Sequence, residues 1–374
     1  MVREPDWVSH HPELAGWLLQ LDETRCTHLN DHPEALADEV RSWLPGAADY
    51  GALTQVPDLR PAVETVAALT LAERDAVDMP GRKRLQAGAL CAALLPVTAP
   101  ALDWCCGKGH LARTLTRITG RPVTGFEWNP ALVNDGNRLA RRFGDPVSLR
   151  HQDVMLADLD WPTGAHAVAL HACGDLHRKL IRDSVRHRSP RVSLSPCCYH
   201  LTDQAIHKPL SARARQQPEA LVLTPDIIRL AVQETVTAPQ RVRVQTRLAQ
   251  AWRLGFDGLQ RELRGDDSYL PLPTHPARLV NGDFESFVRW AAERKSLALP
   301  TQVNWAHWEQ YGATRLQEVR RYELVRHLFR RPLELWLVLD YALALEEAGY
   351  RVRVGTFCER SLTPRNLLVD AILG

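Results

Sequence analysis

The stretch Ala101–Pro130, ALDWCCGKGHLARTLTRITGRPVTGFEWNP, decides the fold. An apolar run, Val97 to Leu102, leads into Asp103 and a tight Gly107-Lys108-Gly109 turn, and a helix-patterned segment then returns to a short strand that ends at Glu127. Glycine tolerates positive φ and has no Cβ, so the backbone here can approach a ligand closely, while the helix start offers unpaired N–H groups. We interpret the stretch as a βαβ half-site for a nucleotide cofactor, in which Glu127 bonds both ribose hydroxyls.

The acid at the head of this turn indicates which cofactor binds. A dinucleotide brings a pyrophosphate, which the carboxylate of Asp103 would repel, whereas S-adenosylmethionine brings an ammonium and a sulfonium. We therefore predict S-adenosylmethionine, with Asp103 contacting its amino-acid end, usually through water. Asp153, which follows the strand-like Val147–Arg150, is placed to accept from the adenine amino group, although capping a helix is an alternative role for it. The predicted cofactor-binding residues are Asp103, Cys105, Gly107, Gly109, Glu127 and Asp153.

At these residues the sequence resembles the class I S-adenosylmethionine-dependent methyltransferases. Three further motifs narrow the resemblance: ALHACGDL at 169–176, SPCCYH at 195–200 and TPRNLL at 363–368. Together they resemble the methyltransferase-domain family of the methyltransferase-like 25 proteins and the glutathione S-transferase C-terminal-domain-containing protein, and more distantly the eukaryotic tRNA ribose methyltransferase of the acceptor stem. The resemblance covers about residues 79–203 and 331–374. Many class I enzymes have glycine where this chain has Cys105, so we expect its loop to lie slightly further from the cofactor.

Strand and helix signals alternate through this part of the chain, which predicts an α/β fold with a doubly wound, Rossmann-like parallel sheet of order 3-2-1-4-5 and helices on both faces. A long insertion then precedes the last two strands, which the resemblance implies close the sheet as a hairpin-like pair. The predicted strands are the region of Leu102, Val123–Glu127, Val147–Arg150, Ala167–His171, Val192–Ser195, Tyr350–Thr356 and Leu367–Leu373.

We predict three regions. Residues 1–78 form an acidic helical prefix, residues 79–203 and 331–374 form the cofactor domain, and residues 204–330 form a mainly helical insertion. The insertion is interpreted as a lid over the cofactor domain that helps to select the substrate. Its arginines, interleaved with Trp252, Phe256 and Tyr269, suggest as an alternative that it grips a nucleic-acid backbone and stacks bases. The predicted helices are His11–Glu23, Pro33–Leu44, Leu59–Val77, Leu85–Leu95, Asp226–Thr235, Thr246–Phe256, Phe284–Leu299 and Leu335–Ala348.

The ends of the first, fourth and fifth strands are neighbours in such a sheet, and they gather a set of cysteines and histidines. Three hypotheses follow. The favoured one is plain methyl transfer to an oxygen or nitrogen, with a nearby base removing the acceptor proton. The second is a thiolate from Pro196-Cys197-Cys198 that adds to a pyrimidine ring before carbon methylation. The third is a zinc site, although the CxxC spacing of zinc ligands is missing and no metal is predicted. The predicted catalytic residues are His171, Asp175, Cys197, Tyr199 and His200.

Alternative roles are open for Tyr199, for Lys83 and Gln86, and for the cysteines. Tyr199 could stack an aromatic acceptor base, or pack in the core with a bonded hydroxyl. Lys83 and Gln86 could face the cofactor cleft, or point to solvent from a helix. The cysteines could also be small buried apolar residues, above all Cys105 or Cys106.

Charge and composition bear on partners and location. The net charge is +2, but residues 1–78 hold fifteen Asp or Glu and five Lys or Arg, so the remainder carries +12. This asymmetry predicts a partner with phosphates, and RNA, in particular tRNA, is the acceptor to test first; a protein or small-molecule acceptor and a non-catalytic cofactor-binding module are the alternatives. No apolar run of about eighteen residues and no signal-peptide core is present. We predict a cytoplasmic protein without membrane contacts, and leave its oligomeric state open.

Overall fold

The structure, a computed structural model, describes residues 4–217, 221–233 and 239–374. The chain forms two compact units, residues 1–53 with 238–329, and residues 54–237 with 330–374. This division differs from the predicted one. Most of the insertion shares a unit with the N-terminal helices, whereas residues 54–78 and 204–237 belong to the unit that holds the sheet. We call the first the helical unit and the second the sheet unit.

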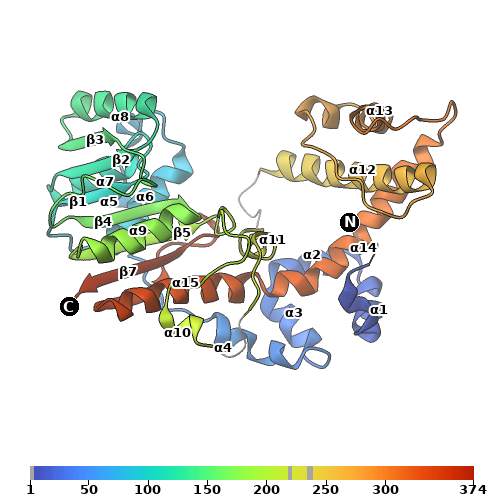
Figure 1. Ribbon diagram of the computed structural model, residues 1–374, viewed down its shortest axis with the longest axis horizontal. Coiled ribbons are helices and arrows are strands. Elements are labelled where there is room, and N and C mark those ends of the chain that lie inside the picture. The colour runs from blue at the N-terminus through green and yellow to red at the C-terminus, as the bar shows by residue number, and fades with distance from the viewer. Residues whose placement is uncertain (1–3, 218–220, 234–238) are drawn as a thin grey trace. The chain divides into compact units, whose positions relative to one another are not determined.

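The sheet unit is built on seven strands in the order β3-β2-β1-β4-β5-β7-β6 (Figure 1). The first five are parallel, and β7 pairs antiparallel with both β5 and β6. The predicted order and the closing antiparallel pair are therefore confirmed. The strands are β1 Ala101–Trp104, β2 Val123–Glu127, β3 Val147–His151, β4 His166–Cys173, β5 Arg191–Cys197, β6 Tyr350–Thr356 and β7 Leu367–Leu373.

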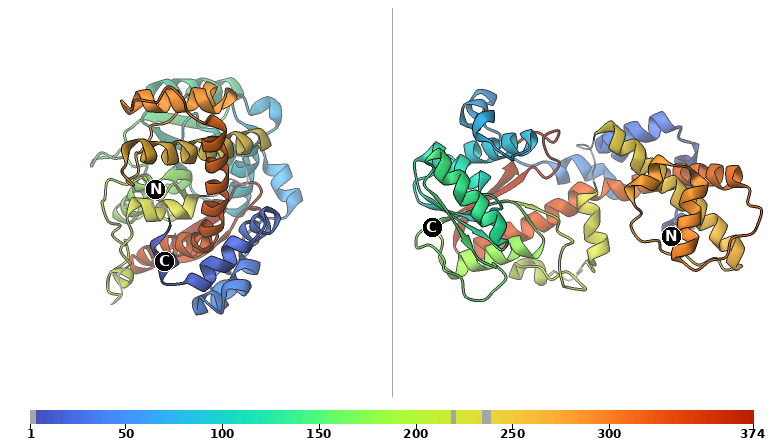
Figure 2. Two further views of the ribbon diagram at one scale, coloured as in Figure 1. Left: turned by 90° about the vertical axis from the view of Figure 1, so that its right-hand side faces the viewer. Right: turned by 90° about the horizontal axis from the view of Figure 1, so that it is seen from above.

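Helices cover both faces of this sheet (Figures 1 and 2). Alternate residues of the strands serve the two faces, because successive side chains of a strand point to opposite sides. In β1, Leu102 and Trp104 join the core beneath α9 and α15, while Ala101 joins the core beneath α6 and α7. The helices of the sheet unit are α5 Val63–Leu69, α6 Gly81–Ala93, α7 His110–Thr119, α8 Pro130–Phe143, α9 Asp175–Arg186, α10 Ala212–Arg215, α11 Pro225–Ile228 and α15 Arg330–Glu347, and α4 Tyr50–Thr54 lies at the boundary between the units.

Two predicted helices of this unit are shorter than expected. The segment predicted as Leu59–Val77 contains only α5 and a 3₁₀ turn, Glu73–Asp75. It does not begin at Leu59 because residues 57–59 run along β6, where the Leu59 N–H donates to the Thr356 carbonyl at 2.9 Å. The segment predicted as Asp226–Thr235 contains α11 and a 3₁₀ turn, Arg229–Val232, and its last two residues lie outside the described residues.

The helical unit contains α1 Pro12–Gln20, α2 Glu23–Asp31, α3 Pro33–Val40, α12 Gln240–Arg264, α13 Phe284–Arg294 and α14 Trp305–Leu328. Helices α2 and α14 were not predicted from the sequence. Glycines let α12 and α14 cross closely, since a Cβ on Gly312 would lie 2.2 Å from the Ala251 carbonyl oxygen. The two ends of α14 pack in different cores, Trp308 with α12 and α13, and Tyr322 with α1–α3.

The suggestion that aromatic residues of the insertion stack bases is wrong for two of the three. Trp252 and Phe256 are buried in the core of the helical unit, where they pack among aromatic and aliphatic side chains, and only Tyr269 is exposed. Across the part of the chain that the structure describes, no helix is long and apolar enough to cross a membrane.

Candidate functional site

The turn after β1 is built for close backbone approach. Cys105, Gly107 and Gly109 have φ of 57°, 56° and 69°, which is the left-handed region. The Cys106 N–H donates to the Phe126 carbonyl at 3.0 Å, which ties the turn to β2. Gly136 of α8 lies against the turn, where a Cβ would come 2.7 Å from the Lys108 carbonyl oxygen. The turn is thus fixed from two sides, directly before α7.

Glu127, the predicted ribose ligand, lies at the end of β2 and holds the turn in place. One carboxylate oxygen accepts the Gly107 N–H at 3.0 Å, and the other accepts the Asn129 N–H at 2.9 Å. The residue is buried. An ionised carboxylate has about four acceptor positions, so two positions are left for the hydroxyls of a ribose.

Asp103 is the buried acid of this region. One of its oxygens accepts the Ala112 N–H of α7 at 3.0 Å, and burial raises the pKa of its carboxyl group to about 7. A cation placed beside it would favour the ionised form and lower that pKa again.

Asp153 follows β3 and is exposed. Its carboxylate accepts the Met155 N–H at 2.9 Å, so it caps a turn and not a helix. The neighbouring Gln152 N–H donates to the Glu127 carbonyl at 2.9 Å, which brings the ends of β3 and β2 together. The predicted adenine ligand and the predicted ribose ligand therefore belong to adjacent strand ends.

Trp128 was not among the predicted site residues. It directly follows Glu127 and its side chain is 71% exposed, although large aromatic residues usually bury most of their surface. The signal was available in the sequence, as a tryptophan placed immediately after the acid that ends the second strand.

The ends of β4 and β5 carry the second half of the site. The pairing Leu170–Ser195 is followed by Cys173–Cys197, so β4 contains one extra residue, which is a bulge. His171 in this bulge has φ 62°, and Cys198 after β5 has φ 46°. Non-glycine residues in this region each store on the order of 1–3 kcal/mol of strain, and such residues cluster at functional sites.

His171 is held as a specific tautomer. The Gln86 amide N–H donates to the Leu362 carbonyl at 2.9 Å, which turns its oxygen toward His171, 3.2 Å from Nε2. The Nε2–H therefore donates to Gln86, and Nδ1 keeps its lone pair. Nδ1 is buried without a hydrogen-bond partner, and burial lowers the pKa of the imidazole to about 4. Gln86 is thus buried and does not point to solvent, whereas Lys83 is exposed.

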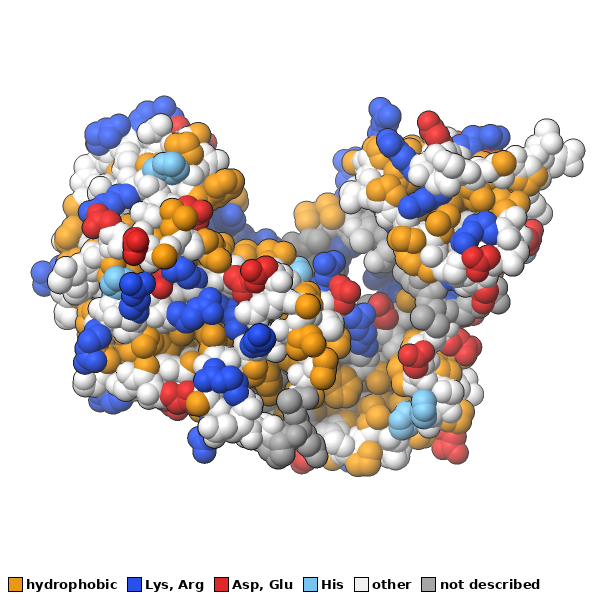
Figure 3. All heavy atoms as spheres, in the orientation of Figure 1, with side chains coloured by type: hydrophobic (Ala, Val, Ile, Leu, Met, Phe, Trp, Pro, Cys, Tyr) orange, Lys and Arg blue, Asp and Glu red, His pale blue; other side chains and the backbone are white. Residues whose placement is uncertain are grey.

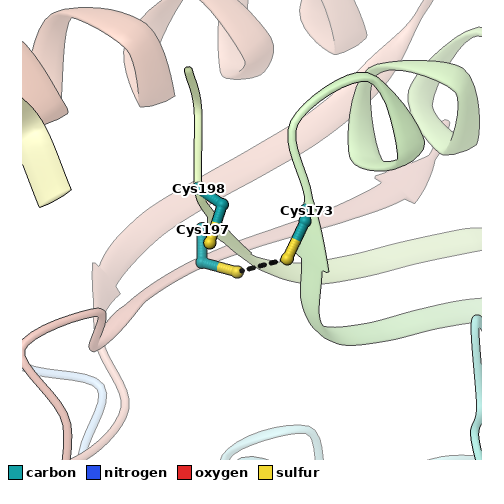
Figure 4. A group of neighbouring side chains, drawn as sticks. All are labelled: Cys173, Cys197 and Cys198. Atoms are coloured by element: carbon teal, nitrogen blue, oxygen red, sulfur yellow. Dashed lines mark hydrogen bonds between the residues drawn. The ribbon is translucent and has the colours of Figure 1, made fainter. Parts of the chain in front are cut away.

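The thiols of Cys173, Cys197 and Cys198 form one cluster (Figure 4). The Cys173 and Cys197 sulfurs are 3.5 Å apart. Hydrogen bonds from the other two thiols lower the pKa of Cys198, whereas a hydrogen bond with Cys173 is the main cause that raises the pKa of Cys197. Cys197 is also buried, whereas Cys198 is half-buried.

Tyr199 does not line the acceptor side. It is 3% exposed, its hydroxyl donates to the Glu334 carboxylate at 3.3 Å, and its ring stacks on Tyr341 with centroids 6.5 Å apart. The alternative of core packing with a bonded hydroxyl is what the structure shows. The Tyr341 hydroxyl also contacts His177, whose other ring nitrogen contacts the Ala172 carbonyl at 3.0 Å. Tyr199 therefore belongs to a buried network that supports the end of β4.

Asp175 and His200, the remaining predicted catalytic residues, differ in their surroundings. Asp175 begins α9. Its carboxylate accepts the Asp203 N–H at 3.1 Å and lies 3.7 Å from the Arg178 guanidinium. The hydrogen bond ties the loop after β5 to the start of α9. His200 is half-buried, and its Nδ1 has no hydrogen-bond partner.

Burial raises the pKa of the thiol of Cys105, in the turn after β1, to about 12. This fits a small packed residue in that turn.

Residues 96–205 match a family model described as a methyltransferase domain, which covers 110 of the 374 residues. No curated protein matches the chain. Among solved structures, the chain is similar to geranyl diphosphate C-methyltransferase from Streptomyces coelicolor A3(2), at 24% identity over 29% of this chain and 42% of that one, with a TM-score of 0.26. It is also similar to the Pyrococcus abyssi tRNA (uracil-54, C5)-methyltransferase, at 18% identity over 30% and 29% of the two chains, again with a TM-score of 0.26.

The chain therefore spans less than half the length of either protein, and likenesses at these TM-scores support no inference about its substrate. The family match identifies residues 96–205 as a methyltransferase domain, and these residues contain strands β1–β5 of the doubly wound sheet.

Proposed function

We propose that the chain is an S-adenosylmethionine-dependent methyltransferase that modifies an oxygen or nitrogen atom of RNA, with tRNA as the first candidate. We propose also that it acts in the cytoplasm. The observation that carries the chemistry is the unpartnered Nδ1 of His171 at the end of β4. The charge distribution supports the acceptor, since everything after residue 78 carries +12. All eight cysteines are free thiols, which fits a reducing compartment.

The cofactor is proposed to lie along the ends of β1, β2 and β3. Glu127 bonds the ribose hydroxyls, Asp153 accepts from the adenine amino group, and the exposed indole of Trp128 stacks on the adenine ring. Asp103 faces the ammonium end, and the turn at Gly107 lets the backbone approach the cofactor closely. When bound, S-adenosylmethionine supplies an electrophilic methyl group.

The acceptor is proposed to enter at the ends of β4 and β5. His171 Nδ1 takes the proton that the acceptor loses, and Gln86 keeps the ring in the required tautomer. A weak base suffices for this step, because an oxygen or nitrogen becomes much more acidic as it gains a methyl group. His200 lines the same edge of the sheet.

The structure weakens one argument for an RNA acceptor, base stacking by the insertion, and leaves the charge argument in place. The buried positions of Trp252 and Phe256 leave fewer aromatic platforms than the sequence suggested. Figure 3 shows Lys and Arg side chains scattered over the visible face of the sheet unit, with acidic side chains among them. This pattern supports contacts to phosphates at separate points more than a single continuous basic track.

Labelled cofactor and fractionated cell extract test the proposal. The full chain is incubated with methyl-labelled S-adenosylmethionine and each fraction, and the label is then challenged with RNase or protease. We expect label in a small-RNA fraction that RNase releases and protease does not. Label that only protease releases, or label in small molecules, would show that the acceptor is not RNA.

A further inference from the structure

Three thiols from two adjacent strands meet at one point of the sheet unit (Figure 4). Cys173 ends β4, Cys197 ends β5, and Cys198 follows directly. Their sulfur atoms all lie within 4.8 Å of one another. Among the described residues, this is the one group of three histidine, cysteine or acidic side chains whose ligand atoms come so close.

The backbone departs from regular strand geometry at both places needed to form this cluster. The extra residue in β4 sets Cys173 opposite Cys197, where a regular register after Leu170 would set Ala172. Neighbouring residues of an extended strand point to opposite faces, so Cys197 and Cys198 would diverge if β5 simply continued. The left-handed φ of 46° at Cys198 changes the direction of the chain there, and the two sulfurs stay together.

The spacing of the sulfurs fits a tetrahedral metal ion. Zinc–thiolate bonds of about 2.3 Å in tetrahedral geometry separate the sulfurs by about 3.8 Å. The observed Cys173–Cys197 distance is 3.5 Å, and the other pairs remain within 4.8 Å. A disulfide would need about 2 Å and would leave the third thiol without a role. Soft thiolate ligands select zinc among the common divalent ions of a cell, since calcium and magnesium prefer oxygen.

The surroundings suit a negatively charged metal–thiolate group. Three thiolates and one divalent ion carry a net negative charge, and the guanidinium group of Arg365 lies near enough to act on Cys198. The cluster holds only three protein ligands in the described chain, which leaves the fourth tetrahedral position open. Three protein ligands with one open position is the arrangement of catalytic rather than structural zinc sites.

We propose that Cys173, Cys197 and Cys198 bind one zinc ion, with its fourth position available to solvent or to an acceptor atom. Each protonated thiol releases its proton to solvent as it binds the ion. The site goes beyond methyl transfer as derived above, because it requires neither RNA nor any particular acceptor. It also gives the bulge in β4 and the conformation of Cys198 a common purpose.

Cobalt titration of the reduced, chelator-stripped full chain tests the site directly. We expect one Co²⁺ per chain, with sulfur-to-cobalt charge-transfer absorption in the near ultraviolet and the intense visible bands of a tetrahedral ion. Zn²⁺ should abolish both signals by displacing the cobalt. Absence of thiolate-type absorption, or binding far below one ion per chain, would overturn the proposal.

Three variants assign the ligands. Cys173→Ser and Cys198→Ser should weaken Zn²⁺ binding at least about 100-fold, because even the loss of residues behind the ligands costs about 10–100-fold. Cys358→Ser is the matched control; it changes a buried free cysteine outside the cluster and should leave zinc affinity unchanged. A circular-dichroism spectrum and a thermal unfolding midpoint equal to those of the wild type show that each variant is folded.

Two further outcomes would refute the site. One is unchanged zinc affinity in the cluster variants. The other is a Cys173–Cys197 disulfide that forms equally fast with and without Zn²⁺, which would identify a redox pair in place of a metal site. Methyl transfer can succeed or fail independently of all these readouts, so a failure here is distinguishable from a failure of the proposed function.

Discussion

The protonation of Asp103 depends both on its burial and on the charge of a ligand beside it. Its pKa is raised to about 7 because it is buried at the head of the glycine turn. The folded, ligand-free chain therefore binds a proton that the unfolded chain has lost, so its stability falls as pH rises from about 4 to about 7. A cationic ligand prefers the ionised form, so its affinity changes in the opposite direction.

We predict that S-adenosylmethionine binds more tightly as pH rises from about 5.5 to about 7, by up to about tenfold per pH unit, with little change above that range. Asp103→Asn should bind more weakly and lose this dependence. Isothermal calorimetry at a series of pH values measures both. An unchanged pH dependence in the asparagine variant would show that Asp103 does not face the cationic end.

Substitution of His171 should affect the rate of methyl transfer but not the binding of the cofactor. We predict that His171→Gln lowers the methylation rate about 10²–10⁴-fold, as expected for loss of a general base, with the cofactor dissociation constant unchanged within about twofold. Single-turnover kinetics and calorimetry make the comparison, and His10→Gln, at an exposed position of the helical unit, is the control. A His171→Gln variant that retains the full rate would require another base.

Several candidate site residues could be proposed from the sequence because they lie at fixed points of a βαβ unit. Asp103, Glu127 and Asp153 follow from strand ends, and the structure brings their strands together. The roles of Gln86 and Cys198 could not be predicted. Gln86 depends on a contact with His171 across 85 positions, and Cys198 depends on a backbone conformation that no residue pattern announces.

At the scale of elements, a segment was easier to predict from the sequence when a regular pattern of apolar residues runs along it. The strands β2, β6 and β7 were predicted to the residue. In β6 apolar residues alternate with Arg351 and Arg353, which is the period-2 pattern of a strand, and β7 is mainly apolar. The helix α14 was missed for the opposite reason. Its first turns pack in one core through Trp308 and its last turns in another through Tyr322, so no single apolar stripe runs along it.

The contact between α8 and the cofactor turn can be tested with one methyl group. A Cβ at Gly136 would meet the Lys108 carbonyl at 2.7 Å, so we predict that Gly136→Ala shifts the turn, costs about 1–3 kcal/mol of stability and weakens cofactor binding. Gly81→Ala in α6 meets no atom within 4 Å and should change neither quantity for the worse. Thermal unfolding and calorimetry on both variants check this. Equal behaviour of the two would mean that α8 does not position the turn.

At the scale of the whole molecule, the division into units depended on contacts that periodicity cannot reveal. Leu14 and Leu18 of α1 share a core with Tyr322 and Val325 of α14, about three hundred residues later. Each segment alone shows only an apolar face that needs a partner. The acidic prefix and the insertion were therefore predicted as separate regions, whereas residues 1–53 and 238–329 form one unit.

The charge asymmetry of the chain predicts how acceptor binding responds to salt. If the acceptor is RNA, its affinity should fall at least about tenfold between about 50 and 200 mM salt, since a few displaced counterions suffice for that. Fluorescence anisotropy with labelled tRNA measures the slope, and an uncharged acceptor fragment is the comparison. A flat salt dependence for tRNA would argue for a protein or small-molecule acceptor.

Calorimetric titration of S-adenosylmethionine into the full chain and its Glu127→Ala variant tests the central claim most directly. We predict one site per chain in the wild type and about 10–100-fold weaker binding in the variant, because hydrogen bonds to a charged carboxylate are worth about 1.5–3 kcal/mol. Glu64→Ala, at an exposed position of α5, should bind like the wild type. A wild-type chain that binds no cofactor, or a Glu127→Ala variant that binds it equally well, would contradict the account.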